Sequence, residues 1–418
     1  MEKRILVICQ RYWPENHKLI DICEGFTERG VKVDVLCGQP HYDEKIRYIK
    51  KYDKDQEIRN GVRIFRAKET KTENRSTLNA ILNAVTFRLS SRSKAKELLE
   101  NDYDRIFIYQ ISPITMCSAG LWIGKKLNKE ISLFAAELWP QTAEIEFDVR
   151  SRTLKGFLQA LSEHYYMGVD KLIVNAESTR DYFINTLQIQ ENKVACVPQS
   201  AERIFESEKH DDNLLDRFAG SFNIVYIGEV GRCQMFKTVL DAMELIVENG
   251  IKNIRLIVVG SGDHLGKLQD AVIARRLRDY IFFEGGQPDD EIPKYLNLAD
   301  ALLDTRRAND SEEYYIPDKL ASYMAAEKPL VLAVGGPART IVKQAACGYV
   351  CEPEDAEALY QNIKRLYNMS PERRAKLGKN AKEYQLKYFN RETNIERLLG
   401  EIYGSKEQKG TEYHWFDE

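Results

Sequence analysis

The chain has 418 residues, which is too long for one hydrophobic core and suggests two or three domains of about 150 residues each. Its 43% hydrophobic and 30% charged residues are typical of a soluble globular protein. A net charge of -3 argues against nucleic acid as a partner, and no stretch approaches the ~20 consecutive apolar residues of a transmembrane helix, so any membrane contact must be peripheral.

The first half of the chain alternates strand and helix patterns. A strand at 4–9, a helix at 19–29 and a strand at 31–37 form a βαβ unit, which implies a parallel sheet with right-handed crossovers. Further strand patterns lie at 62–66, 105–109, 131–136 and 171–175, with helical patterns between them. We predict a doubly wound, Rossmann-like α/β domain over residues 1–198.

A second series follows a polar linker at 199–216. Strands are predicted at 222–227, 254–260, 280–286, 301–305 and 330–334, and helices at 238–248, 265–278, 291–298 and 319–326. This second Rossmann-like domain spans residues 217–389. A helix at 390–404, with Asn390 as its N-cap, and a polar tail at 405–418 complete the chain. Two such folds should face a common cleft and bind ligands at the carboxyl ends of their strands.

The stretch 312–336 contains a Pro-Asp-Lys turn, a short apolar helix and a buried strand. Pro317 suits the first turn of a helix, which places Lys319 beside backbone N–H groups and the positive end of the helix dipole. Such a place attracts phosphate, and Asp318 and Ser322 of the same helix are assigned to the same site. The alternative for Lys319 is an ordinary surface lysine.

The segment after strand 222–227 offers a second anion site. Gly228 and Gly231 allow a tight turn, and Arg232 and Lys237 lie near the start of the next helix. Together with Lys319 these cations would converge on a pyrophosphate, whereas the alternative is a turn with two surface cations.

Other loops at the same sheet edge give weaker signals. Gly260 and Gly262 have the spacing GxGxxxG, which predicts a tight strand-to-helix turn and does not match the dinucleotide motif GxGxxG. Glu284 and Gly285 end a strand where the backbone could hydrogen-bond a base, or they form a plain turn.

Two neighbouring carboxylates precede the Pro-Asp-Lys turn. Glu312 and Glu313 could accept hydrogen bonds from sugar hydroxyls, or they are solvated surface charges.

The first domain has candidate acceptor-binding residues after two of its strands. Glu137, Trp139 and Gln141 follow strand 131–136, where an acid beside an aromatic ring can hold a sugar, although Trp139 could also be a core residue. The loop after the first strand contributes Trp13, Glu15, Asn16, His17 and Lys18.

Residues 78–99 form an amphipathic helix pattern. Its apolar stripe consists of Leu78, Ile81, Leu82, Val85 and Leu89, and Arg88, Arg92, Lys94 and Lys96 gather towards its end. Such a helix can lie on an anionic membrane, and the basic cluster at 150–157 would extend that surface. An ordinary domain helix with a solvated face is the alternative.

The sequence offers no sign of a metal or cofactor. The eight cysteines are scattered, no pair has the spacing of metal ligands, and no Ser-His-Asp order, Walker loop or DxD pair is evident. We expect reduced, mostly buried thiols in a cytoplasmic protein, no metal and no cofactor.

The ordered motifs resemble a known family, the retaining GT-B glycosyltransferases of family 4, and within it the bacterial O-antigen, capsule and colanic-acid transferases such as the L-fucosamine transferases. QRYWPENHKLID resembles the first loop of that branch, AELWPQTAE its D-L-W-P signature with Glu137 for aspartate, and VGSGDHLGKL and IPDKLASYMAAEKPLVLA its later motifs. The resemblance covers roughly residues 4–403.

The resemblance implies transfer of a sugar from a nucleoside diphosphate, with UDP and an N-acetylated hexosamine or deoxyhexosamine favoured, to a lipid-linked saccharide. It implies retention of configuration, with Arg232 and Lys319 stabilising the leaving diphosphate, in a cytoplasmic protein that is peripheral on the inner face of the membrane. Tyr314 and Ser322 stand where many members have two glutamates, the second of which binds ribose. A UDP-sugar 2-epimerase and a non-catalytic partner subunit are the alternatives.

Overall fold

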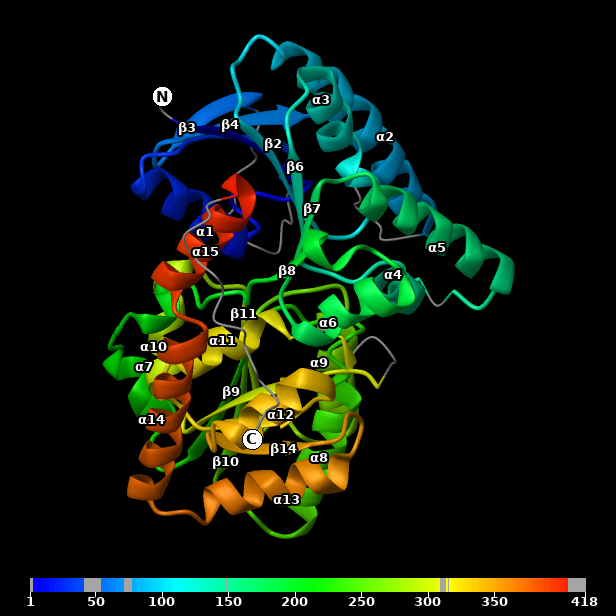
Figure 1. The fold of residues 1–418 in the computed structure, drawn as a ribbon. Helices are drawn as coiled ribbons and strands as arrows, with labels where there is room; N and C mark the ends of the chain where they lie inside the picture. Colours follow the sequence, from blue (N-terminus) through cyan, green and yellow to red (C-terminus); the bar gives the residue numbers. More distant parts are fainter. Residues whose placement is uncertain are drawn as a thin grey trace. The chain divides into compact units, whose positions relative to one another are not determined.

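The computed structural model describes residues 3–40, 54–70, 77–147, 149–308, 313–314 and 316–404. They divide into two compact units (Figure 1). The first comprises the described residues up to Gln199 together with those from Arg391 onward, and the second comprises Ser200–Asn390. Residues 199–216, predicted as a linker, therefore lie almost entirely in the second unit, where they contain η4 (Arg203–Glu206) and α7 (Asp212–Arg217). The predicted tail at 405–418 lies outside the described residues.

The described part of the first unit contains an eight-stranded sheet in the order β3-β4-β2-β1-β5-β6-β7-β8. All neighbouring strands pair in parallel except β3 and β4. Its strands are β1 (Arg4–Ile8), β2 (Lys32–Gly38), β3 (Gln56–Arg59), β4 (Val62–Ala67), β5 (Arg105–Gln110), β6 (Ile131–Ala135), β7 (Lys171–Val174) and β8 (Val194–Cys196). Its α-helices are α1 (His17–Glu28), α2 (Thr77–Glu97), α3 (Ser118–Leu127), α4 (Gln141–Glu146), α5 (Arg152–Met167), α6 (Glu177–Asp181) and α15 (Arg391–Tyr403).

Helices cover both faces of this sheet, with α1 and α15 on one face and α2, α3 and α5 on the other (Figure 1). The central strands are buried on both faces, which is why β1 and β5 are continuous apolar runs. The last helix, α15, packs on α1 of the first unit, where Ile395 lies against Gly25 so closely that an added Cβ would approach its Cδ1 to 2.3 Å. The sequence did not predict this partner.

The second unit is a six-stranded parallel sheet with the order β11-β10-β9-β12-β13-β14. Its strands are β9 (Phe222–Ile227), β10 (Ile254–Val259), β11 (Ile281–Gly285), β12 (Ala301–Thr305), β13 (Leu330–Ala333) and β14 (Gly348–Cys351). Besides α7, its helices are α8 (Phe236–Glu248), α9 (Leu265–Ala274), α10 (Ile292–Leu298), α11 (Asp318–Ala325), α12 (Gly336–Gln344), α13 (Ala356–Tyr367) and α14 (Pro371–Tyr388). In Figure 1, α8 and α13 cover one face of this sheet, and α10, α11 and α14 the other.

Strand order in both sheets reverses beside the first strand, as the prediction of doubly wound folds requires. Two details differ from the prediction. The edge strands β3, β8 and β14 are short and were missed, and the helix predicted at 265–278 ends at Ala274 because Arg276 takes a left-handed backbone with φ 59°. The core-facing side of α2 consists of Phe87, Ser91 and Ala95, while Ile81, Leu82, Val85 and Leu89 of the predicted apolar stripe are exposed.

Candidate functional site

The candidate site lies at the carboxyl edge of the second sheet. Because all six strands run in parallel, the loops after β9, β10, β12 and β13 gather at this edge, and α11 begins there. Lys319 points back towards the sheet. Its Nζ lies 3.4 Å from Asp304 Oδ1 and 5.0 Å from the ring centroid of Tyr226, and its side chain is 13% exposed. Lys319 is therefore a fixed cation at the strand ends and not a surface lysine.

Gly228 makes room for this lysine. A Cβ added at position 228, where φ is 138°, would lie 2.4 Å from Lys319 Cε. Gly231, in the same loop, donates its backbone N–H to Gln234 Oε1 at 3.0 Å. Gly228 thus makes room for Lys319, whereas Gly231 belongs to the turn closed by Gln234.

The loop after β10 fits closely against the loop after β9. At Gly260 and Gly262 φ is 154° and 157°, and an added Cβ would lie 1.8 Å from Gly228 O and 2.3 Å from Val230 O. Backbone hydrogen bonds from Gly228 N to Val259 O (2.9 Å) and from Val230 N to Ser261 O (2.8 Å) extend the pairing beyond the strands. The predicted tight turn is confirmed, and close backbone approach is the physical reason for both glycines.

Arg306 is a further cation of this edge and was not among the site residues predicted from the sequence. It follows β12 and is 8% exposed, with Nε 3.4 Å from Asp304 Oδ2 and Nη2 3.6 Å from Asp318 Oδ1. Asp304, which is itself 3% exposed, thus lies between Lys319 and Arg306. Arg306 and Arg307 directly follow the buried strand β12, and this was the signal, because a cation in that position must lie at the ligand-binding edge.

Arg232 is exposed in the loop after β9. The backbone N–H of Arg307 donates to Cys233 O at 2.8 Å, which joins this loop to the segment that carries Arg306. The structure thus brings the loop of Arg232 and the helix of Lys319 to one edge, and their joint action on a diphosphate stays a prediction.

Two predicted donor residues have protein partners of their own. Lys237 extends along α8, where its Nζ lies 2.6 Å from Asp241 and its side chain is 65% exposed. Glu284 accepts a hydrogen bond from Arg217 at 2.9 Å. Its neighbour Gly285, with φ 69°, accepts from Gly260 N at 2.8 Å. These contacts do not bring the side chains of Lys237 and Glu284 to Lys319.

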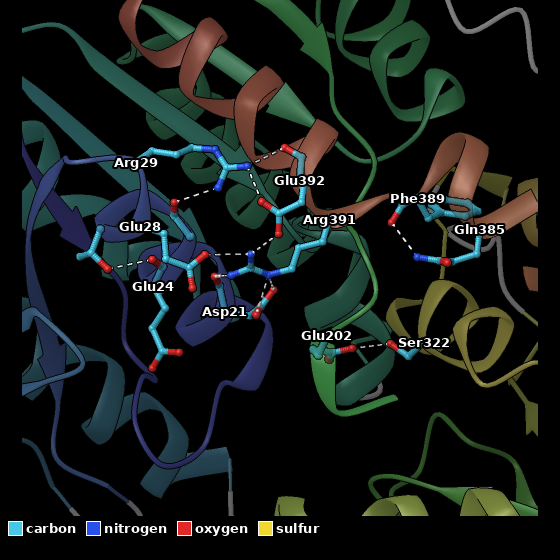
Figure 2. Close-up of polar contacts among 12 residues, drawn as sticks. Asp21, Glu24, Glu28, Arg29, Glu202, Ser322, Gln385, Phe389, Arg391 and Glu392 are labelled. Carbon is cyan, nitrogen blue, oxygen red and sulfur yellow. Dashed lines mark hydrogen bonds and ion pairs between the residues drawn. The ribbon is translucent and has the colours of Figure 1, made fainter. Parts of the chain in front are cut away.

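Two acidic residues precede α11. Glu312 lies outside the described residues, and Glu313 is exposed. Ser322, on the second turn of α11, is 2% exposed and donates its hydroxyl hydrogen to the carboxylate of Glu202 (Figure 2). No local sequence pattern indicates this pairing, because 120 residues separate the partners.

Buried tyrosines support the strand ends beneath the site. The hydroxyl of Tyr323 accepts from Ile227 N at 2.9 Å and lies 3.2 Å from Ile227 O. Burial raises the pKa of Tyr323 and of Tyr226 well above the usual tyrosine value. Both phenols therefore stay neutral and serve as hydrogen-bonding supports.

The first unit places the predicted acceptor residues at the ends of β1 and β6. Trp139 is 5% exposed and donates from Nε1 to Ser112 Oγ at 3.1 Å, so its ring belongs to the core. Glu137 accepts from Ser112 N at 2.9 Å, and Gln141 donates to the hydroxyl of Tyr182 at 2.8 Å. This loop is built around Ser112, and in the structure Trp139 offers no exposed ring for stacking on a sugar.

The loop after β1 is held by its own polar contacts. Asn16 is the N-cap of α1 and accepts from Leu19 N at 3.1 Å, while His17 and Lys18 form the first turn. The guanidinium of Arg59 covers the ring of Trp13. Glu15 donates its backbone N–H to Tyr12 O. Asn16 thus has a structural role, and acceptor binding by this loop stays a prediction.

Comparison with known proteins finds a family match within the second unit. Residues 209–384 match the model of the family Glycosyl transferases group 1. An amylovoran biosynthesis glycosyltransferase, AmsK of Erwinia amylovora, is 24% identical over 186 residues, which are 43% of this chain and 46% of that one. The alignment thus spans less than half of that relative.

Solved structures share the whole fold. Sucrose-phosphate synthase from Thermosynechococcus elongatus superposes with a TM-score of 0.73 at 16% identity, covering 96% of this chain and 98% of that one. HepE from Anabaena, solved with UDP and glucose, gives a TM-score of 0.71 at 14% identity, covering 96% and 98%. The fold is GT-B, as predicted. In the part of the chain that the structure describes, no helix combines the length and apolar character that crossing a bilayer requires.

Proposed function

We propose that this protein is a retaining, metal-independent glycosyltransferase of surface polysaccharide synthesis, such as that of O-antigen or capsule. It takes a sugar from a nucleoside diphosphate and passes it to a hydroxyl of a lipid-linked saccharide. One observation carries this proposal: Lys319, Arg306 and the glycine-containing loops after β9 and β10 lie together at the carboxyl edge of the second sheet. This edge lies within the residues that match the glycosyl transferases group 1 family.

The charges at this edge suit a diphosphate leaving group. As the bond between the sugar C1 and the phosphate oxygen breaks, negative charge grows on the diphosphate. Lys319, Arg232 and the N–H groups at the start of α11 stabilise that charge. The carboxylate of Asp304 pairs with both the ammonium of Lys319 and the guanidinium of Arg306, and so holds the two cations in place. The acceptor oxygen bonds to C1 on the same face, and its proton passes to the departing phosphate oxygen, so no separate protein base is required.

A UDP-linked N-acetylated hexosamine or deoxyhexosamine is the proposed donor. HepE, which shares the fold, was solved with UDP and with UDP-glucose. The resemblance to transferases of bacterial surface polysaccharides supports the choice of sugar.

A lipid-linked acceptor requires the enzyme to work at a membrane surface, and the first unit offers a suitable face. Ile81, Leu82, Val85 and Leu89 of α2 are between 47% and 65% exposed, although they form one apolar stripe. Phe157 of α5 is 62% exposed among basic residues of the 150–157 cluster. We infer that this face rests on an anionic lipid surface, with the protein cytoplasmic and peripheral.

Donor consumption tests the proposal. The protein is incubated with a panel of UDP- and GDP-sugars, with and without an extract of lipid-linked saccharides, and free nucleotide is measured. A transferase releases nucleotide only with acceptor present. Solvent deuterium incorporated into the sugar without acceptor would indicate a 2-epimerase, and absence of nucleotide binding would indicate a non-catalytic partner subunit; either result would overturn the proposal.

A further inference from the structure

Glu202 and Ser322 form a contact that the proposed reaction does not use (Figure 2). Glu202 precedes η4, and Ser322 lies on the second turn of α11. The hydroxyl of Ser322 lies 3.5 Å from Asp318 O, but its shorter contact is with Glu202 Oε2. Because the hydroxyl has a single hydrogen, the carboxylate of Glu202 is its acceptor. Ser322 therefore holds a carboxylate against the flank of α11.

The serine that holds this carboxylate lies on the same helix as the cation that we propose for the diphosphate. Ser322 follows Lys319 by three residues on one helix, and side chains at that spacing project from the same side, with Cβ atoms about 5–6 Å apart. The side chain of Lys319 reaches Asp304 at the strand ends. Ser322, which holds the carboxylate of Glu202, is thus one helical turn from Lys319.

A nucleoside diphosphate carries hydroxyl groups that suit a carboxylate in this position. Directly beside the diphosphate, the ligand carries a ribose with two neighbouring hydroxyls, both of which donate hydrogen bonds. An ionised carboxylate has two acceptor oxygens with about four lone-pair sites, so it can accept from such a diol and still accept from a serine hydroxyl. Hydrogen bonds to a charged acceptor are also stronger than those between neutral groups.

We propose that Glu202 binds the ribose hydroxyls of the donor nucleotide and that Ser322 orients its carboxylate. This assignment rests on the proposed function, because it needs a nucleotide on Lys319. It gives the site a specificity for ribonucleotides. It also gives Ser322 a positioning role, in which the carboxylate comes from a segment 120 residues away.

Binding of UDP and of its 2′-deoxy and 3′-deoxy analogues to the full chain tests this assignment by calorimetry. The wild type should bind UDP about tenfold or more tightly than either analogue. Glu202→Gln should lower the affinity for UDP about 10- to 100-fold and bring the ratio of UDP affinity to deoxy-analogue affinity towards one. Ser322→Ala should reduce the same ratio in part. The double variant Glu202→Ala with Ser322→Glu should restore it, because the carboxylate returns from the helix itself.

Glu206→Gln is the matched control, since Glu206 ends the same η4 segment but pairs with Lys382 at 2.9 Å. It should leave both affinity and ratio unchanged. If Glu202→Gln weakens UDP and the deoxy analogues equally, Glu202 only anchors the segment and the assignment is wrong. Should Glu202→Gln fail to fold, a wild-type ratio in Ser322→Ala, or a ratio that stays near one in the double variant, would equally overturn it. A wild type that binds neither UDP nor GDP would contradict the proposed function as well, whereas an unchanged ratio with normal turnover contradicts this assignment alone.

Discussion

The guanidinium of Arg391 donates from Nε to both carboxylate oxygens of Asp21, at 2.9 and 2.7 Å, although 370 residues separate the two in the chain. Arg391 is the first residue of α15, and Asp21 lies on α1 (Figure 2). The Nη1 of Arg391 also lies 3.1 Å from the carboxylate of Glu28 and 2.7 Å from that of Glu392. One buried arginine thus ties the last helix of the chain to the first helix of the first unit.

Arg391→Met should destabilise the first unit by about 3–5 kcal/mol, because it leaves the nearly buried carboxylate of Asp21 without its counter-charge. Urea unfolding followed by circular dichroism measures this loss. Lys382→Met is the control, since its pair with the more exposed Glu206 should contribute less than about 1 kcal/mol. Equal, small losses in both variants would show that the ion pairs of Arg391 stabilise the first unit no more than an exposed pair does.

The ion pairs of Arg391 should also make the free energy of unfolding depend on pH. Burial raises the pKa of Glu392, but hydrogen bonds from Arg29 and Arg391 outweigh it and lower the pKa from 4.5 to about 2. A carboxylate that is more acidic in the folded state stabilises the fold above its unfolded pKa and loses that contribution as the pH falls through the folded pKa.

We therefore expect the stability difference between wild type and Glu392→Gln to be full above about pH 4.5 and to shrink as the pH approaches 2. Unfolding midpoints measured across this range test it. Glu383→Gln, an exposed position on α14, serves as the reference. A difference that stays constant down to pH 2 would show that Glu392 has no lowered pKa.

The close backbone approach at Gly260 predicts that an added side chain there destabilises the second unit. Gly260→Ala would bring a Cβ to 1.8 Å from Gly228 O at a φ of 154°, so the two loops beneath Lys319 must separate. We expect a loss of more than about 3 kcal/mol or failure to fold, together with loss of UDP binding. Gly266→Ala is the matched control, since nothing lies within 4 Å of its added Cβ and a helical alanine should stabilise by about 0.5–1 kcal/mol. A tolerated Gly260→Ala would contradict the tight fit.

Lys319→Ala tests the proposed chemistry. It removes the cation that faces the leaving group, and turnover with the true donor should fall about 10²–10³-fold, as when one oxyanion-hole donor is removed. Lys252→Ala, an exposed lysine just before β10 at the opposite edge of the sheet, should leave turnover unchanged. Near-full turnover in Lys319→Ala would show that the diphosphate binds elsewhere.

The exposed stripe on α2 predicts membrane binding. Leu89→Asp replaces its most exposed apolar side chain and should weaken binding to phosphatidylglycerol vesicles about tenfold or more in a co-sedimentation assay. The control is Ile273→Asp, which changes another exposed apolar side chain, 47% exposed on α9 of the second unit, and should bind like the wild type. Equal binding of Leu89→Asp and wild type, or no binding of the wild type itself, would argue that the stripe has another partner.

The sequence by itself determined the alternation of strands and helices, both doubly wound sheets and the positions of Lys319, Gly228 and Gly260. Each depends on local signals: apolar runs of buried parallel strands, a proline at a helix start and glycines at strand ends. The order along the chain then fixes which loops share a sheet edge, because parallel strands all end on the same side.

Only the tertiary structure decided the contacts between distant residues. Asp304 is one more buried strand residue in the sequence, and folding places it between two cations. The apolar stripe at Leu89 was read as one face of α2, but which face meets the core depends on what packs there. Likewise the partner of α15 and the carboxylate beside Ser322 come from segments 370 and 120 residues away. No local pattern encodes such pairings, because they form only when both segments are folded.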